Sequence, residues 1–287
     1  MFNLRKTTLC VLAAILMVAA GCTRYGLSTD PSLVRFTSSA KGFDEVKATD
    51  VTLSDDDEVG IFAGEPIVAG NVRGVVSGKS IFPDRELYWG DGQKIATRFS
   101  AYCPYSPEVS GEIFPFSVSE DQRLYAGYAA SDLRTASVTA NPGDIVNFIF
   151  EHRLSKIILD IDPGGRVISS VSVGKVCREA VVDMKTGEVS DLSGRGPVSA
   201  GLATVSADSR VYVAVFMPET VRPELIITAD GKKYRYILES VQEFLPGCAY
   251  FASLILDDGD IVETPVGFSV TVTDWENGEP MDFIPEQ

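Results

Sequence analysis

The sequence of 287 residues contains a single histidine, His152, and this scarcity restricts the chemistry open to the protein. A cluster of histidine ligands for a metal ion is excluded, and a Ser-His-Asp triad would have to use this one residue. The sequence also lacks a GxSxG elbow, a phosphate-binding loop and a GxGxxG motif. Because His152 stands beside Arg153 at the end of an alternating apolar segment, a structural role is favoured. We therefore predict no catalytic residue, no cofactor and no enzyme activity.

Positive charge is the second scarcity, since 25 Lys and Arg residues face 40 Asp and Glu residues, for a formal net charge of −15. Nucleic-acid binding depends on Lys and Arg contacts to phosphate, so nucleic acid is disfavoured as a partner. An acidic surface suits a soluble exported body that resists non-specific association. Two acidic runs, residues 55–58 and 257–260, lack the alternating oxygen ligands of an EF-hand loop. We interpret both runs as solvated turns rather than calcium sites.

Cysteine is also scarce, with five residues at wide spacings: Cys10, Cys22, Cys103, Cys177 and Cys248. No pair has the CxxC spacing of a zinc site. The first two belong to the N-terminal signal described next, which leaves an odd number. The simplest interpretation is that the remaining three are small buried hydrophobic residues. The sequence leaves open whether two of them form a disulfide.

No apolar run reaches the roughly 20 residues that a membrane-spanning helix requires. Residues 7–20 form an uncharged run behind Arg5 and Lys6, and the run leads into Ala19-Ala20-Gly21-Cys22. A positive start, a short apolar stretch and small residues are typical of a secretory signal. The final cysteine resembles that of the bacterial lipobox, where the thiol carries diacylglycerol. We predict a lipoprotein signal peptide at residues 1–21 and a lipidated Cys22, with a chance cysteine behind an ordinary signal as the alternative.

Long stretches of helical periodicity are absent, and most apolar segments are short and bounded by Gly, Pro, Asp or Asn. Several alternate with period two, which places one face of a strand on a core. The predicted strands are residues 59–63, 98–102, 113–118, 146–150, 157–161, 211–217, 224–228, 250–256 and 268–273. Asp230-Gly231 predicts a hairpin because this pair tolerates the positive φ angles of a type I′ turn, and residues 185–188 predict a second turn. Regular short strands of this kind predict an all-β protein built from β-sandwiches.

The turn Asn141-Pro142-Gly143-Asp144 and the strand behind it suggest a domain boundary near residue 150. We predict an N-terminal β-sandwich domain at residues 51–150 and a C-terminal β-sandwich domain at residues 151–287. Residues 22–50 are predicted to hold a flexible tether from the lipid, followed by a first strand at Leu33–Thr37 that the resemblance described next implies.

Five strand-and-turn segments, taken together in their order and spacing, resemble the pattern of a known family. They are DEVGIFA at residues 57–63; YW at 88–89 with RFSAYCPY at 98–105; FSV at 116–118 with DQ at 121–122; FIFEHRLSKI at 148–157; and VTVTDWENG at 270–278. Behind a lipobox, this set resembles the fimbrillin family of Bacteroidales, the subunits of type V pili. The match spans nearly the whole mature chain.

The resemblance implies two tandem transthyretin-like β-sandwich domains in a non-enzymatic fimbrial subunit that serves surface adhesion. It implies export to the outer membrane and cell surface, where Cys22 holds the chain in lipid. A trypsin-like protease then removes the first strand, and a strand of another fimbrillin subunit fills the groove. Physically this is β-augmentation, in which a donor strand satisfies unpaired backbone groups and apolar pockets. The implied partners are other subunits, outer-membrane lipid and the processing protease; the surface receptor is not identified.

The processing site follows from the same resemblance. The family's major subunit is cut after arginine in the loop behind the first strand. The matching loop here, residues 38–44, carries Lys41, whereas Arg35 lies inside the predicted strand. Its small polar residues are typical of a nicking site, so Lys41 is the predicted processing residue. The tail after Trp275 is short, which suits an accessory, tip or anchor role.

Two other classes of function compete with this interpretation. A surface glycan-binding lipoprotein is the first, because exposed aromatic rings can stack on sugars. Its candidate residues are Tyr88, Trp89, Tyr102 and Tyr105, although such aromatics are more often core residues. A secreted hydrolase is the second, and it lacks a nucleophile or acid–base signature. Paired carboxylates stay open in principle, but no pattern singles out a pair.

Overall fold

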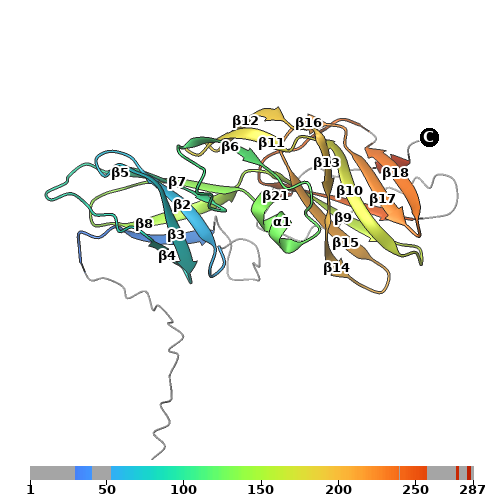
Figure 1. Ribbon diagram of the computed structural model, residues 1–287, viewed down its shortest axis with the longest axis horizontal. Coiled ribbons are helices and arrows are strands. Elements are labelled where there is room, and N and C mark those ends of the chain that lie inside the picture. The colour runs from blue at the N-terminus through green and yellow to red at the C-terminus, as the bar shows by residue number, and fades with distance from the viewer. Residues whose placement is uncertain (1–29, 41–52, 239, 257–275, 278–282, 286–287) are drawn as a thin grey trace, which may run out of the picture.

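A computed structural model describes residues 30–40, 53–238, 240–256, 276–277 and 283–285 (Figure 1). Across these residues the chain folds almost entirely into β-strands, with one short helix, α1 (Tyr125–Ser131). The predicted all-β class is therefore confirmed. No helix in the described part of the chain is long and apolar enough to cross a bilayer. The predicted strand at 268–273 lies outside the described residues.

The first seven-stranded unit closes on itself, in the order β1-β4-β3-β2-β5-β7-β8. The strands are β1 (Arg35–Ala40), β2 (Glu58–Ala63), β3 (Ala69–Ser77), β4 (Ser80–Pro83), β5 (Thr97–Cys103), β7 (Arg134–Ala140) and β8 (Ile145–His152). The two sheets of the predicted N-terminal β-sandwich are thus joined at their edges by continuous strand pairing, so the strands form a closed barrel. Alternation explains its interior: Val146, Phe148 and Phe150 of β8 all point into one core, whereas the residues between them face outward.

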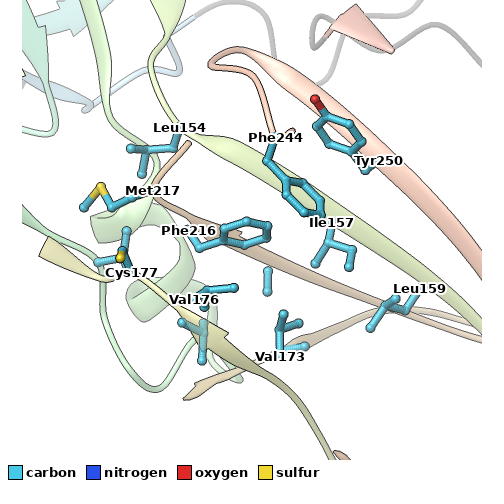
Figure 2. Packing of buried hydrophobic residues seen from close by; sticks show 14 of the residues in the cluster. Leu154, Ile157, Leu159, Val173, Val176, Cys177, Phe216, Met217, Phe244 and Tyr250 are labelled. Atoms are coloured by element: carbon cyan, nitrogen blue, oxygen red, sulfur yellow. The ribbon is translucent and has the colours of Figure 1, made fainter. Parts of the chain in front are cut away.

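Two five-stranded sheets form the second unit, in the orders β14-β15-β9-β20-β21 and β13-β10-β17-β18-β22. The first holds β9 (Ser155–Asp162), β14 (Gly201–Val205), β15 (Arg210–Phe216), β20 (Cys248–Ile255) and β21 (Glu276–Asn277). The second holds β10 (Ile168–Val176), β13 (Gly196–Ser199), β17 (Glu224–Ala229), β18 (Lys232–Leu238) and β22 (Phe283–Pro285). Side chains of both sheets share one buried core, as the predicted β-sandwich requires (Figure 2).

Aromatic rings fill one end of this second core. Phe216 and Phe244 meet edge to face with ring centroids 5.1 Å apart, and Phe244 meets Tyr250 at 4.7 Å. Figure 2 shows these rings beside Ile157 of β9 and Val173 of β10. Edge-to-face pairs add to the stabilisation that burial alone provides.

Strand pairing and side-chain packing both connect the two units. Strand β6 (Ile113–Ser117) comes from the first half of the sequence but pairs with β11 (Glu179–Asp183), which also pairs with β12 (Glu188–Ser193). Phe62 and Tyr102 of the barrel strands contact the second core rather than the first. The barrel strands end at His152 and β9 begins at Ser155. A domain boundary near residue 150 remains a prediction.

Local turn chemistry explains the hairpins. Asp230 and Gly231 have φ angles of 47° and 76°, and they join β17 to β18 as predicted. Gly187, with φ of 75°, lies in the predicted turn between β11 and β12. A smaller pair, β16 (Thr220–Val221) and β19 (Gln242–Glu243), completes the described strands.

Candidate strand-binding site

Strand β1 closes the barrel by lying between β8 and β4 (the blue strand of Figure 1). It pairs in parallel with β8 over six residues, from Arg35 opposite Ile145 to Ala40 opposite Phe150. Its pairing with β4 is antiparallel and covers two residue pairs. The predicted first strand at Leu33–Thr37 is therefore present but shifted towards the C-terminus, since Leu33 forms only an isolated bridge with Tyr88.

Inward-facing side chains anchor β1 in the barrel. Val34, Phe36 and Ser38 are all buried. The ring of Phe36 stacks on Phe148, with centroids 5.8 Å apart and planes at 1°, and meets Phe99 edge to face at 5.6 Å. Burying a side chain of this size stabilises the folded state by roughly 1.5 to 3 kcal/mol. β1 thus fills an aromatic slot that the other strands leave open.

Backbone hydrogen bonds hold the remaining positions. The Val34 amide donates to the Leu87 carbonyl and the Ser38 amide donates to the Lys79 carbonyl, each at 2.8 Å. A third bond at 2.8 Å runs from the Trp89 amide to the Ser32 carbonyl. Loss of β1 would leave the facing groups of β8 and of residues 79–89 unpaired along two edges. Unpaired strand edges beside apolar pockets form a template for another strand.

The outward face of β1 carries a side-chain contact that sequence analysis missed. Thr37 Oγ1 donates to Asn147 Oδ1 at 3.0 Å, and Asn147 Nδ2 donates to Ser39 Oγ at 3.0 Å. One amide of β8 therefore bridges two hydroxyls of β1. The signal in the sequence is an asparagine at the centre of an alternating apolar strand, where this residue type is depleted.

The predicted modification and processing residues, Cys22 and Lys41, lie outside the described residues, as does Lys47, the next basic residue after Lys41 in the sequence. β1 ends at Ala40, immediately before Lys41. Arg35, the other basic residue near the strand, is exposed but has its backbone in the β1–β8 ladder. A protease needs extended, accessible backbone, so Arg35 is a poor substrate position while β1 is seated.

His152 occupies a buried charged cluster at the end of β8. Its Nδ1 lies 2.6 Å from Asp132 Oδ1, and Arg134 Nε lies 3.7 Å from Asp132 Oδ2. Burial raises the pKa of the Asp132 carboxyl, but His152 and Arg134 lower it by more, so the pKa falls below its ordinary value. The nearby thiol of Cys103 has a pKa raised to about 12, chiefly by burial. A thiol in that state is no nucleophile near neutral pH.

The three later cysteines and the first acidic run have ordinary structural surroundings. Cys103, Cys177 and Cys248 are all buried, as expected of small hydrophobic residues. Among the described residues no group of three or more His, Cys, Asp or Glu side chains is placed to hold a metal ion. In the acidic run before β2, Asp55 accepts from the Gly78 amide and Asp57 from the Ser54 amide, as expected of a turn. The run at 257–260 lies outside the described residues.

The four aromatic residues considered for sugar stacking do not form one surface. Trp89 is buried in the barrel core, whereas Tyr102 is buried in the second core, where its hydroxyl lies within hydrogen-bonding distance of Asn71 Oδ1 and the Ser106 carbonyl. Tyr105 packs against the second core, and Tyr88 is half exposed. A sugar platform needs several exposed rings side by side, and this arrangement does not provide it.

Comparison with known proteins supports the architecture. A family model described as fimbrillin-like matches residues 47–275. A candidate cell adhesion protein of Bacteroides ovatus superposes with a TM-score of 0.65 at 17% identity, covering 82% of this chain and 96% of that one. Another from Bacteroides uniformis gives 0.62 at 19% identity, with 79% and 94% covered, and one from Bacteroides fragilis gives 0.53 at 13% identity, with 84% and 99% covered. No curated protein matches the sequence.

These structural likenesses are all below 20% identity, so they show the shared fold alone. The family model covers most of the sequence, including every described strand from β2 to β20. The chain therefore belongs to the fimbrillin-like family.

Proposed function

We propose that this chain is a fimbrial adhesion subunit that joins its neighbours by exchanging β1 for a strand of another subunit. The observation that carries the proposal is the place of β1, a short N-terminal strand that fills an aromatic slot between β8 and β4. Membership of the fimbrillin-like family supports the subunit role, and the family is typically non-enzymatic.

The assembly step follows from the way β1 is held. Its contacts are a backbone ladder on each side and two buried apolar side chains, Val34 and Phe36, all of which another extended strand can supply. Cutting the chain after β1 does not by itself expel the strand, because these contacts persist. A competing strand must displace it, so assembly is slow and depends on concentration.

Processing and anchoring complete the proposal. Cleavage at Lys41 separates β1 from the barrel immediately behind its last residue, Ala40. The lipoprotein signal at residues 1–21 directs export, and acylated Cys22 holds the precursor in outer-membrane lipid at the cell surface. Two sandwich domains, divided near residue 150, then form the body of the subunit.

Limited trypsin digestion of the mature, lipid-free chain tests the assembly step. Intact protein should stay monomeric, whereas nicked protein should form SDS-resistant oligomers over hours. Lys41→Ala combined with Lys47→Ala should block both nicking and assembly, and Lys79→Ala is a matched control that should block neither. If the nicked protein never assembles, alone or with other fimbrillins, strand exchange is wrong and glycan binding becomes the leading function.

The anchor has its own test. Cys22→Ala should abolish lipid labelling and release the protein into the soluble periplasmic fraction. Cys10→Ala is the matched control, since this cysteine leaves with the signal peptide and its loss should change nothing. Unchanged membrane association of the Cys22 variant would contradict the lipid anchor.

A further inference from the structure

Asn147 is the one polar residue between two apolar ones on the outer face of β8. Its outward neighbours along the strand, Ile145 and Ile149, are 51% and 47% exposed. In β1 the residues opposite these three are Arg35, Thr37 and Ser39, and only the two hydroxyl residues touch Asn147.

The amide of Asn147 uses both of its ends in this contact. Its oxygen accepts from Thr37 Oγ1 and its nitrogen donates to Ser39 Oγ, both at 3.0 Å. A side-chain amide has one accepting and one donating end, so two hydroxyls spaced two residues apart can pair with one end each. An aliphatic side chain at either position would leave one end without this partner.

This outward contact distinguishes between strand registers, which the inward pockets do not do. The pockets at Val34 and Phe36 respond to apolar volume, and several apolar side chains suit such pockets. A slip of two residues keeps every side chain on its own face of the sheet, because the side-chain period is two. Such a slip would nevertheless bring Arg35 or Ser39 opposite Asn147 in place of Thr37 and break at least one of the two hydrogen bonds.

We propose that Asn147 is a specificity-determining residue of the groove, and that it selects incoming strands carrying small hydroxyl side chains at the places of Thr37 and Ser39. The inference rests on the proposed function, because it describes the strand that replaces β1. The partner is a second fimbrillin-type chain whose donor strand runs parallel to β8.

The required strand is defined further by the inward positions. It takes a large apolar side chain at the place of Phe36, where Phe148 and Phe99 form the slot. It needs a small residue at the place of Ser38, which is buried although polar. Apolar strands without the two outward hydroxyls should enter the groove but bind less tightly and in more than one register.

Peptide exchange into the full mature chain tests this selection. A recognition sequence for a specific protease is placed between Gly42 and Phe43, the chain is cut, and a fluorescent peptide of residues 32–40 is added. Anisotropy then measures how well unlabelled peptides compete. The peptide with Thr37→Val and Ser39→Val should compete about threefold to tenfold less well than the parent, the effect of one or two modest hydrogen bonds. Arg35→Gln, which changes an outward residue away from Asn147, should compete as well as the parent.

The same peptides are then offered to the Asn147→Val chain, with Ile145→Val as the matched receptor control. The parent and the double-valine peptides should compete equally for the Asn147→Val chain, whereas Ile145→Val should keep the full preference. Equal competition for the unaltered chain, or a preference that survives Asn147→Val, would overturn the inference while strand exchange stands. If even the parent peptide fails to enter the cut chain, strand exchange itself fails and the inference fails with it.

Discussion

β1 and β9 are both interior strands of their sheets, yet they are held very differently. β9 forms seven residue pairs with β15 and seven with β20, whereas β1 forms six with β8 and only two with β4. Three apolar side chains of β9, namely Ile157, Leu159 and Ile161, are fully buried, whereas in residues 35–39 of β1 the buried apolar side chain is Phe36 alone. The more weakly held strand is thus the one nearest the N-terminus.

This difference indicates which strand can separate from the rest of the protein most easily. Proteins open locally in units whose free energies range from near zero up to that of global unfolding, and weakly paired strands lie at the low end. Removing β9 would divide the second core, but removing β1 would uncover one slot of the barrel.

Large-to-small substitutions should separate the two strands most strongly. Leu159→Ala in β9 should lower the free energy of global unfolding by about 2 to 5 kcal/mol, since it creates a cavity in a fully buried core. Phe36→Ala should act mainly on β1, so that hydrogen exchange of the Val34 and Ser38 amides accelerates while amides of β9 keep their protection. Equal acceleration in both strands after Phe36→Ala would contradict the separate opening of β1.

The buried cluster at the end of β8 provides a second, smaller effect. His152→Ala should cost roughly 1 to 3 kcal/mol of stability, because Asp132 loses its closest partner inside the protein. Asp132→Asn in the same chain should recover part of this loss, because it removes the buried carboxylate charge that has lost its closest partner. Urea denaturation measures both variants. If purified protein shows a hydrolase activity that His152→Ala removes, the structural role of this residue is wrong.

The smallest expected effect concerns the stability of the protein at acidic pH. Arg98 pairs with Glu112 and, despite partial burial, lowers the pKa of that carboxyl to about 2 from an ordinary value of 4.5. Because the folded-state pKa is lowered, the ionised Glu112 carboxylate stabilises the folded protein, and this stabilisation is complete above pH 4.5. It is lost as the pH falls from 4.5 towards 2. Glu112→Gln should remove about 1 kcal/mol of stability at pH 7 and flatten the acid limb of the stability curve. An unchanged acid limb in this variant would show that the ion pair contributes nothing.

The sequence predicts features that depend on nearby residues. Alternation identifies β8, and the Asp230-Gly231 pair identifies the hairpin between β17 and β18, because both signals are local. The helix α1 was missed because seven residues are too few for a helical period to show. Strand β10 was missed because it mixes serines with valines and contains an irregularity near Lys175, whose φ angle is 65°.

The candidate site shows the same limit. The family resemblance predicts a first strand at Leu33–Thr37, but the partners of β1 lie far away in the chain, and no local pattern identifies β8 or β4. The contact of Asn147 with Thr37 and Ser39 spans more than 100 residues of sequence, so only the folded structure brings the three together. The family resemblance supplied the expectation of a removable first strand, and the structure supplies its neighbours and its register.

Native mass spectrometry of the nicked mature chain at increasing protein concentration tests the separability of β1 most directly. It resolves whether the N-terminal fragment that contains β1 stays with the body. We expect monomers to keep the fragment, and each subunit joined to a donor strand to have lost it. Oligomers in which every subunit retains its β1 fragment would rule out strand exchange, because they would form without it.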